Sequence, residues 1–358
     1  MINTDISKAL LGNSRIPVIG NFELTRKCPL NCVICYNERK QKRELTTDEI
    51  LNILNQIADA GCVHINFTGG DPLTRVDFPD IYRHAIKLGM FPSIESELVH
   101  LTDDAREVLC EYPPYVLSAS LYAVDDDVFR TVTRTSFSAD CVFNHIRELL
   151  AAGVPIRART PFTKLNIGQA GKIARFCREV GITYNPTTKI FWTQDGSRMD
   201  DLRCSPDFVM ESSDGDPIYD YLYSLTANLW NKPIVKHSCD TGISDFNISA
   251  YGEMNFCITF WKPEYDLLNG SFEDAWNNWY PLFRRPEGNY CLGKALFGDG
   301  KNCPWGCLYS NPEIDTSKSL LEHAKDRIHS MQCSGYSLRE ICNQLGLSDK
   351  ALNVILNL

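Results

Sequence analysis

The sequence contains no long hydrophobic run. Hydrophobic residues make up 44% of its 358 positions, yet no apolar stretch approaches the roughly 18 residues that a membrane-spanning helix needs. The first residues, MINTDISKALLGNSRIP, also lack the basic start and continuous apolar stretch of a secretory signal. These absences argue against a membrane or exported protein, and they predict a protein of the reducing cytoplasm.

Positive charge is not in excess either. The chain has 36 Lys and Arg residues against 45 Asp and Glu residues, which gives a net charge of −9. A negative net charge argues against a polyanionic partner such as nucleic acid, and it is compatible with a neutral or basic substrate. No internal repeat or low-complexity tract is present, so the order of apolar and polar segments carries the information about the fold.

Short apolar segments alternate with longer amphipathic ones in the first half of the chain. Strands are expected at 17–24, 62–68, 91–96, 115–122, 154–160 and 182–190. Helices are expected from Thr47, where capping residues precede an apolar periodicity, and at about 75–88, 102–110, 138–152 and 167–180. This alternation predicts a parallel sheet covered by helices, either doubly wound or an incomplete (β/α) barrel, with ligands at the carboxyl ends of the strands.

The pattern changes after about residue 200. Pro, Gly, Trp, Asn and Cys become frequent through 203–312, and the segment 248–258 predicts a hairpin that turns at Tyr251-Gly252. Residues 318–358 are helical in pattern. The sequence therefore predicts a second, loop-rich unit and a helical end.

Fifteen cysteines, an odd number, are hard to explain as disulfides in the cytoplasm and point to metal, cluster or redox chemistry. Cys28, Cys32 and Cys35 stand at CxxxCxxC spacing in RKCPLNCVICYN, just past the first expected strand. A disulfide fragment, a zinc knuckle and an iron-sulfur site are the alternatives. Structural zinc wants four ligands, and no fourth Cys or His lies near the three in sequence, the nearest His being His64. A 4Fe-4S cluster normally has four thiolates, so three would leave one iron open.

The second expected strand ends in FTGGDP, residues 67–72, where Gly69 and Gly70 precede Asp71 and Pro72. Paired glycines let the backbone come close to a ligand, and the aspartate can accept a hydrogen bond from an ammonium group. The same four residues also make a good turn. Their position at a strand end beside the three thiols favours a binding role.

The two motifs together resemble those of the radical S-adenosylmethionine superfamily. CxxxCxxC, with apolar Ile34 before the third cysteine, is similar to its signature loop, and GGDP is similar to its Gly-Gly-Glu-Pro motif for the cofactor's amino group; Asp71 is a departure from that motif. The resemblance implies a partial (β/α)6 barrel whose open iron binds S-adenosylmethionine, and a 5′-deoxyadenosyl radical that abstracts hydrogen from a substrate.

Two further positions resemble the peptide-modifying branch of the superfamily. In VLSASLYAVDDDVFRTVTRTSF, the resemblance implies that Ser120 contacts the ribose or carboxylate of the cofactor and that Arg134 contacts its carboxylate. The alternative is a serine that fills the barrel and a solvated arginine.

A second set of cysteines resembles the auxiliary-cluster domain of the superfamily, called SPASM with two clusters and twitch with one. Cys239, Gly252 and Cys257 match its Cys-x12-Gly-x4-Cys opening, but Lys294 stands where a second cysteine would follow Cys291. The resemblance implies one auxiliary 4Fe-4S cluster on Cys239, Cys257, Cys303 and Cys307, with Cys291 as a replacement ligand or a free thiol. Structural zinc on the same four thiols is the alternative.

The resemblance also implies four regions. These are a radical S-adenosylmethionine partial barrel over 1–200, linker helices over 201–235, a SPASM or twitch domain over 236–312, and a helical extension over 313–358.

Other cysteines are expected to be small buried hydrophobes, namely Cys62, Cys110, Cys141 and Cys177. Cys204 in MDDLRCSP is a candidate donor that returns a hydrogen atom to a substrate radical, as an epimerase requires. Its position near the expected barrel mouth suggests this role.

Residues 336–358 resemble a helix-turn-helix, with Ser337 and Ser348 as caps around a turn at Gly346. Residues 318–358 hold five Lys or Arg against four Asp or Glu, too little positive charge to attract phosphate strongly. A packed helical pair that forms part of a substrate or partner surface is therefore expected.

The function that the resemblance implies is maturation of a ribosomally synthesised peptide by thioether formation, carbon-carbon cross-linking or epimerisation. Oxidation or decarboxylation of a small metabolite is the alternative among enzymes, and an iron-sulfur regulator is the alternative outside them. An electron donor such as flavodoxin or ferredoxin is implied. Only about 16 residues precede the first strand, too few for the leader-binding domain of many relatives, so a separate protein or residues 318–358 would bind a leader peptide.

Overall fold

The computed structural model describes most of the chain. The described residues are 15–37, 42–191, 193, 199–231, 242–255, 264–283, 320–345 and 349–357. Among them, no helix is both long enough and apolar enough to cross a membrane.

The described strands form one sheet in the order β6-β5-β4-β3-β2-β1-β7-β8-β9. The first six are parallel to their neighbours: β1 (Ile19–Thr25), β2 (His64–Gly69), β3 (Phe91–Ser96), β4 (Val116–Ser120), β5 (Ile156–Pro161) and β6 (Thr183–Thr187). A doubly wound sheet would reverse its strand order at a switch point. Because strands β1 to β6 follow chain order without reversal, the partial barrel is confirmed.

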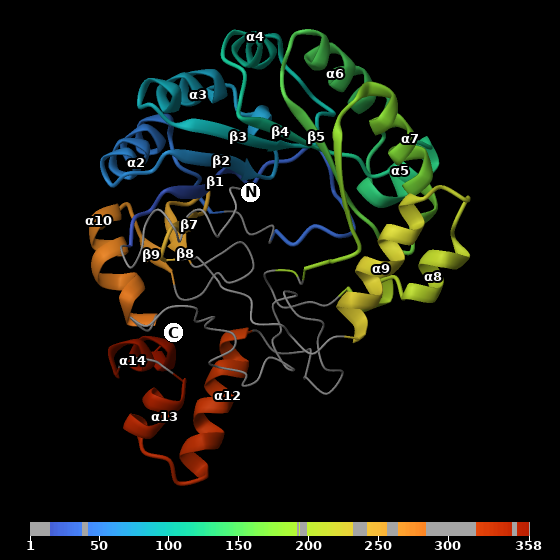
Figure 1. The fold of residues 1–358 in the computed structure, drawn as a ribbon. Helices are drawn as coiled ribbons and strands as arrows, with labels where there is room; N and C mark the ends of the chain where they lie inside the picture. The colour runs from blue at the N-terminus through green and yellow to red at the C-terminus, as the bar shows by residue number, and fades with distance from the viewer. Residues whose placement is uncertain are drawn as a thin grey trace.

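Helices cover the outer, convex side of this sheet (Figure 1). They are α2 (Thr47–Asp59), α3 (Phe78–Lys87), α4 (Asp103–Glu111), α6 (Ala139–Ala151) and α7 (Ala170–Val180), with short 3-10 turns η1 (Pro72–Thr74) and η2 (Ile167–Gln169) before α3 and α7. Helix α2 begins with a capping box, in which Thr46 and Glu49 satisfy each other's backbone N–H groups. Its apolar face is buried, as the periodicity predicts.

Successive residues of a strand face opposite sides of the sheet. The residues under the helices are apolar and fully buried, for example Phe22 on β1, Phe67 on β2 and Leu117 on β4. The alternate residues are polar and face the inside of the barrel, where Asn66 of β2 donates to Asn21 of β1 across 3.0 Å. Because these inward side chains are polar, the inside of the barrel is suited to binding a ligand, whereas the apolar core lies under the helices.

A hairpin extends the sheet at β1. Strand β7 (Asp245–Ile248) runs parallel to β1, and β8 (Glu253–Asn255) returns antiparallel to β7 and pairs with β9 (Tyr265–Asp266). The turn includes Tyr251 and Gly252, whose φ of 79° is the left-handed conformation that favours glycine. The predicted hairpin is therefore confirmed for its described residues. Helix α10 (Phe272–Asp274), the π-helical turn η4 (Ala275–Trp279) and the 3-10 turn η5 (Tyr280–Phe283) follow it.

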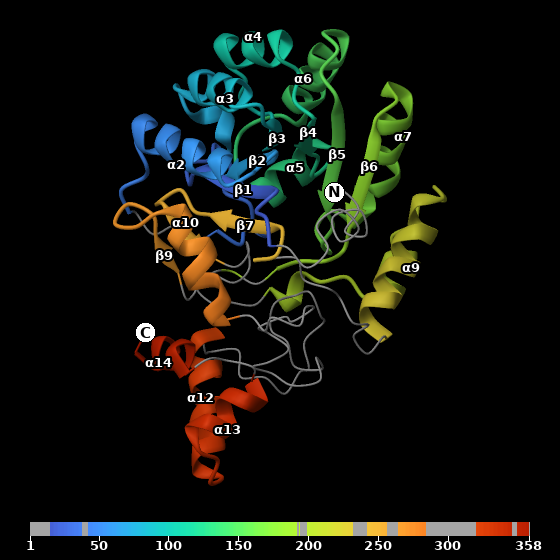
Figure 2. The ribbon, with the colours of Figure 1, turned by 60° about the vertical axis from the view of Figure 1, so that its left-hand side comes forward.

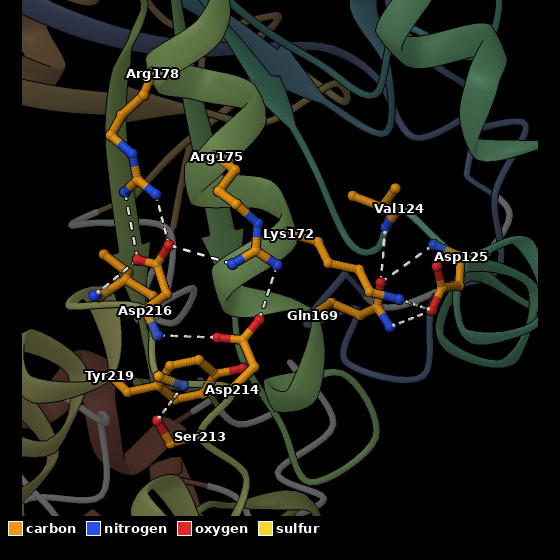
Figure 3. Close-up of polar contacts among 12 residues, drawn as sticks. Val124, Asp125, Gln169, Lys172, Arg175, Arg178, Ser213, Asp214, Asp216 and Tyr219 are labelled. Carbon is orange, nitrogen blue, oxygen red and sulfur yellow. Dashed lines mark hydrogen bonds and ion pairs between the residues drawn. The ribbon is translucent and has the colours of Figure 1, made fainter.

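Two helices pack at the β6 edge of the barrel, next to α7. They are α8 (Pro206–Glu211) and α9 (Ile218–Asn231), and they follow the 3-10 turn η3 (Asp200–Leu202). In Figure 3, Arg175 and Arg178 of α7 point toward Asp214 and Asp216 in the α8–α9 connection. Asp216 has a side chain only 3% exposed and accepts from Arg178 at 2.5 Å and from Arg175 at 3.4 Å. Burial alone would raise the pKa of Asp216, but Arg178 keeps it below its usual value.

Replacing Asp216 by asparagine is expected to lower the free energy of unfolding by about 1–3 kcal/mol, the range for hydrogen bonds to charged groups. Chemical denaturation of the purified protein measures this change. The matched control is Glu111→Gln, because Glu111 pairs with Arg83 in solvent and such pairs contribute about 0–1 kcal/mol. Equal losses for the two variants would contradict the prediction.

Three helices end the described chain: α12 (Leu320–Cys333), α13 (Leu338–Leu345) and α14 (Asp349–Asn357). Figures 1 and 2 place them at the end of the molecule farthest from α4. Ser337 caps α13, accepting from the Glu340 N–H at 3.3 Å while the Glu340 carboxylate accepts from Ser337. Ile328, Ile341 and Ile355 are buried between the helices, so the predicted helical packing is confirmed, whereas Gly346 and Ser348 lie outside the described residues.

Candidate active site

A cavity of about 1190 Å³ opens at the carboxyl ends of the barrel strands. Its wall is formed by the last residues of β1 to β6, by the loop that follows β1, and by Tyr251 of the β7–β8 hairpin. The position agrees with the rule that ligands of parallel α/β sheets bind beyond the carboxyl ends of the strands.

Cys28, Cys32 and Cys35 all line this cavity, and all three are partly exposed. Burial raises the pKa of Cys28 and of Cys32, and the Glu97 carboxylate raises both further. Thiols in such surroundings need a nearby positive charge to ionise, and iron supplies one.

The three thiols fit a 4Fe-4S cluster. No group of three His, Cys, Asp or Glu side chains in the described ranges converges on one point, as a single metal ion requires. A cluster makes no such demand, because each thiolate binds a different iron. Three thiols on one cavity wall would hold three irons and leave the fourth facing the cavity.

The three thiols lie on the loop that follows β1, residues 26–37, here called the cysteine loop. The segment Gly69–Asp71 holds both ends of this loop. The Gly70 N–H donates to the Thr25 carbonyl at 2.7 Å, and the Asp71 N–H donates to the Lys27 carbonyl at 2.9 Å. The Asn37 side-chain amide donates to the Gly69 carbonyl at 2.8 Å. The loop that carries the thiols is therefore fixed at its start and its end by the same three residues.

At Gly69 and Gly70 the backbone of residues 25–27 comes too close to leave room for a side chain. A Cβ atom on Gly69 would lie 2.1 Å from the Thr25 carbonyl oxygen, and one on Gly70 would lie 2.1 Å from the Lys27 carbonyl oxygen. Gly69 also has φ of 130°, which disfavours any side chain. The glycines that the sequence assigned to cofactor binding line the cavity, and they also serve as the contact between β2 and the cysteine loop.

Helix α5 (Asp126–Thr133) supports the middle of the loop. The N–H groups of Asn31 and Val33 donate to the carbonyls of Thr133 and Val132, each at 2.8 Å. Because these carbonyls belong to the last turn of α5, they have no partner within the helix. The cysteine loop thus supplies hydrogen-bond donors to the free carbonyls at the end of α5. The sequence analysis did not predict this helix.

The start of α5 is tied to α7 in turn. The Gln169 side-chain oxygen accepts from the backbone N–H groups of Val124 and Asp125, each at 3.1 Å. Lys172 makes an ion pair with the Asp125 carboxylate, as Figure 3 shows. The contacts run from α7 through α5 to the cysteine loop.

The Asp71 carboxylate is fully buried and does not line the cavity. It accepts from the Leu73 N–H at 3.1 Å, from the Ser96 hydroxyl at 3.0 Å and from the Glu97 N–H at 3.1 Å. Burial raises the pKa of Asp71 to about 6 despite these donors. Asp71 thus joins the ends of β2 and β3, and its expected contact with an ammonium group stays a prediction. Pro72 is buried as the first residue of η1.

Ser120 ends β4 and lines the cavity, as expected. Beside it lie two side chains that the sequence analysis missed, Glu97 and Tyr122. Burial and the nearby Asp71 raise the pKa of Glu97 to about 8, and burial and Cys32 raise the pKa of Tyr122. The sequence did contain one indication that these two side chains face the cavity. Side chains alternate between the two faces along β3 and β4, which places Glu97 on the same face as Glu95, and Tyr122 on the same face as Ser120.

Two predicted residues are not brought to this cavity. Arg134 is exposed, adopts a left-handed φ of 50° at the end of α5, and is not part of the cavity wall. Cys204 is fully buried in the hydrophobic core, and burial raises the pKa of its thiol to about 12. Their roles in cofactor binding and hydrogen-atom transfer stay predictions.

Two further sets of cysteines were predicted from the sequence. Cys62 and Cys177 are buried as expected, whereas Cys110 and Cys141 are half buried. The five cysteines of the predicted auxiliary site lie outside the described residues: Cys239, Cys257, Cys291, Cys303 and Cys307.

A buried ion pair lies just below the cavity. The Glu23 carboxylate of β1 is fully buried, and Arg26 of the cavity wall lies 2.8 Å from it. Burial raises the pKa of Glu23 to about 7, although the guanidinium opposes this shift. Arg26 also stacks on the Tyr251 ring, 5.5 Å from its centroid.

Glu23 should make stability depend on pH. Between its ordinary pKa of 4.5 and about 7, the folded protein keeps a proton on Glu23 that the unfolded chain releases. Rising pH therefore favours unfolding through this window and has no further effect above it. We expect the free energy of unfolding of Glu23→Gln, relative to the wild type, to rise from pH 4.5 to 7 in urea titrations. A constant difference would contradict the assignment.

Comparisons with known proteins find similarity in the part of the chain that forms this site. The sequence profile of the Radical SAM superfamily matches residues 22–177. PqqA peptide cyclase of Streptomyces rochei is 28% identical over 163 residues, which cover 45% of this chain and 44% of that protein. The chain thus spans less than half the length of this curated relative.

Solved structures show the same fold. Streptococcus suis SuiB bound to precursor peptide SuiA has a TM-score of 0.60 at 14% identity, covering 77% of this chain and 68% of that one. Native anSMEcpe with bound AdoMet has a TM-score of 0.55 at 11% identity, covering 92% and 99%. Both the profile match and the fold agree with the CxxxCxxC and GGDP motifs at one cavity. Residues 22–177 therefore match the radical SAM superfamily in sequence, and the barrel has the fold of solved structures that bind AdoMet.

Proposed function

We propose that this protein is an enzyme that cleaves S-adenosylmethionine reductively and modifies a ribosomally synthesised peptide. A reduced 4Fe-4S cluster on Cys28, Cys32 and Cys35 would supply the electron that generates a 5′-deoxyadenosyl radical, which takes a hydrogen atom from the substrate. The side chains and backbone of the cavity wall would hold the cofactor next to the peptide atom from which hydrogen is taken.

One observation carries the proposal. Three thiols, and no fourth cysteine among the described residues, line an open cavity of about 1190 Å³ at the carboxyl ends of the strands. This volume exceeds the roughly 300–1,000 Å³ of ordinary small-molecule sites. It has room for S-adenosylmethionine together with part of a larger substrate.

The chain's residues suggest how the cofactor would be held. Gly69 and Gly70 expose backbone on the cavity wall, and Ser120 offers a hydroxyl group there. Tyr122 and Glu97 complete this wall next to the thiols, and they are the candidates for contacts with ribose hydroxyls. Their burial keeps water away from the reacting atoms.

The relatives favour a peptide as substrate. One is named a PqqA peptide cyclase, and one structural neighbour is bound to its precursor peptide. We therefore propose that this chain cross-links a peptide. Thioether formation and epimerisation are the alternative modifications.

Further parts of the proposal rest on the resemblance. They are an auxiliary 4Fe-4S cluster on Cys239, Cys257, Cys303 and Cys307, a flavodoxin or ferredoxin as electron donor, and a cytoplasmic location. A separate protein or the C-terminal helices would bind a leader peptide.

Anaerobic reconstitution tests the proposal. The full chain, supplied with iron, sulfide, S-adenosylmethionine and dithionite, is expected to release 5′-deoxyadenosine. Adding a short peptide encoded beside its gene should raise this release and change the peptide. Mass spectrometry should show loss of two hydrogen atoms for a cross-link, or unchanged mass with inverted stereochemistry for epimerisation. Absence of 5′-deoxyadenosine would overturn the proposal and favour a regulator.

A further inference from the structure

We propose that Lys189 binds a carboxylate of the substrate, so that the modified peptide carries an acidic group next to the reacting residue. The inference rests on the proposed function, because it assumes a peptide in the cavity. It adds the chemical class of the peptide and the residue that recognises it.

Lys189 lies on the cavity wall, just beyond the end of β6. Thr188 is fully buried, and its hydroxyl lies 2.8 Å from the Thr226 hydroxyl of α9, on the outer side of the sheet. Thr187 is the last residue of β6, and Lys189 follows in the loop beyond it. Both line the cavity.

Aromatic contacts place the ammonium group close to the cysteine loop. The Lys189 Nζ atom lies over the Phe191 ring, 4.9 Å from its centroid. The edge of Phe191 meets Tyr36 at 6.2 Å between ring centroids, and Tyr36 directly follows Cys35. The ring face attracts the cation and limits its movement. A lysine ammonium has three donors, so this contact leaves donors for a ligand.

No carboxylate of the described chain neutralises Lys189. Four carboxylates line the cavity, and three of them are already engaged. Glu95 pairs with Arg159, Asp77 pairs with Arg75 at 2.6 Å, and Glu44 accepts from the Arg26 N–H at 2.7 Å. The fourth, Glu97, interacts with Ser120 and Tyr122.

The cavity wall holds more cations than carboxylates, but most of these cations are paired. Six cationic side chains line it against four carboxylates. Arg26 and Lys42 pair with Glu23 at 2.8 Å and with Glu253 at 2.6 Å, two carboxylates outside the wall. The cations are Arg26, Lys27, Lys42, Arg75, Arg159 and Lys189. Charge of one sign in a cleft with low-dielectric walls attracts ligands of the other sign. The net charge of the chain alone predicted a neutral or basic substrate, whereas Lys189, which no carboxylate of the described residues neutralises, favours an acidic group in the cavity.

Selection from a peptide library tests the inference. The reconstituted full-length protein with bound S-adenosylmethionine is used to select short random peptides, displayed once through their N-terminus and once through their C-terminus. We expect Asp or Glu to be enriched at one position for the wild type. Lys189→Gln should bind the selected peptides roughly tenfold or more weakly, as expected for loss of a charge-assisted hydrogen bond. Lys189→Arg should retain them, and Lys189→Glu should instead select Lys or Arg at that position.

The two display formats separate the sources of the carboxylate. Enrichment of Asp or Glu in both formats identifies a side chain, whereas binding only of peptides with a free C-terminus identifies the terminal carboxylate. The control is Lys87→Gln on the outer helix α3, where the lysine is exposed and absent from the cavity wall. It should select the same peptides as the wild type.

Other outcomes overturn the inference in distinguishable ways. If Lys189→Gln selects the same acidic peptides as the wild type, the inference fails and the proposed function stands. If the wild type selects no acidic peptide, the inference fails, and release of 5′-deoxyadenosine decides separately whether the proposed function stands. If Lys189→Gln loses binding of S-adenosylmethionine in equilibrium dialysis, the lysine serves the cofactor, and the inference fails.

Discussion

Replacing Gly70 by alanine is expected to remove the N-terminal cluster and to lower 5′-deoxyadenosine release by about 100-fold, the cost of misplacing reacting groups by roughly 1 Å. The added Cβ would lie 2.1 Å from the Lys27 carbonyl oxygen and 2.7 Å from the Arg26 carbonyl oxygen. Both atoms belong to the backbone directly before Cys28, so the loop itself has to move. Iron and sulfide analysis after reconstitution measures the loss.

Gly168→Ala is the matched control for this substitution. Gly168 lies in η2, and a Cβ there would meet nothing within 4 Å. We expect this variant to bind iron and to release 5′-deoxyadenosine as the wild type does. If Gly70→Ala also keeps its cluster and its activity, the close approach of β2 to the cysteine loop is not what positions the thiols.

Replacing Cys32 by alanine is expected to reduce 5′-deoxyadenosine release to background, because two thiolates no longer hold the cluster. The backbone around residue 32 should be kept, since its neighbours Asn31 and Val33 bond to α5 through main-chain atoms. Circular dichroism should therefore match the wild type. Electron paramagnetic resonance of the reduced protein should lose the signal that S-adenosylmethionine perturbs.

The iron that Cys32→Ala still binds is informative. If the proposed auxiliary cluster exists, the variant keeps a signal that S-adenosylmethionine does not perturb. Cys141→Ala on α6 is the control, because Cys141 does not line the cavity, and it should behave as the wild type. Full activity of Cys32→Ala would refute the three-thiol cluster.

Much of the barrel could be predicted from the sequence because its signals are local. Strands β1 to β6 alternate apolar and polar residues, and α2 begins at Thr47, where the sequence predicted it. Helix α5 was missed because its eight residues, DDVFRTVT, include two valines and two threonines, which favour strands over helices. Its last turn is stabilised by the cysteine loop, about a hundred residues earlier in the chain, and such a contact leaves no local pattern.

The sequence predicted which thiols come together but not what supports them. The spacing of Cys28, Cys32 and Cys35 predicted a common loop, since spacing is a property of sequence, and all three line the cavity. The partners of Asp71 could not be foreseen, because Ser96 and Glu97 reach it from the next strand. Likewise, Lys189 became notable only once the sheet brought it opposite the cysteine loop.

The supports of the cysteine loop act almost entirely through main-chain atoms. Gly70, Asp71, Asn31 and Val33 all hold it by backbone N–H groups. Side chains between the sulfurs can therefore change without moving them. For the proposed cluster, side chains at 31 and 33 would therefore set the surroundings of the iron and its reduction potential, while the main-chain contacts keep the three sulfurs in place.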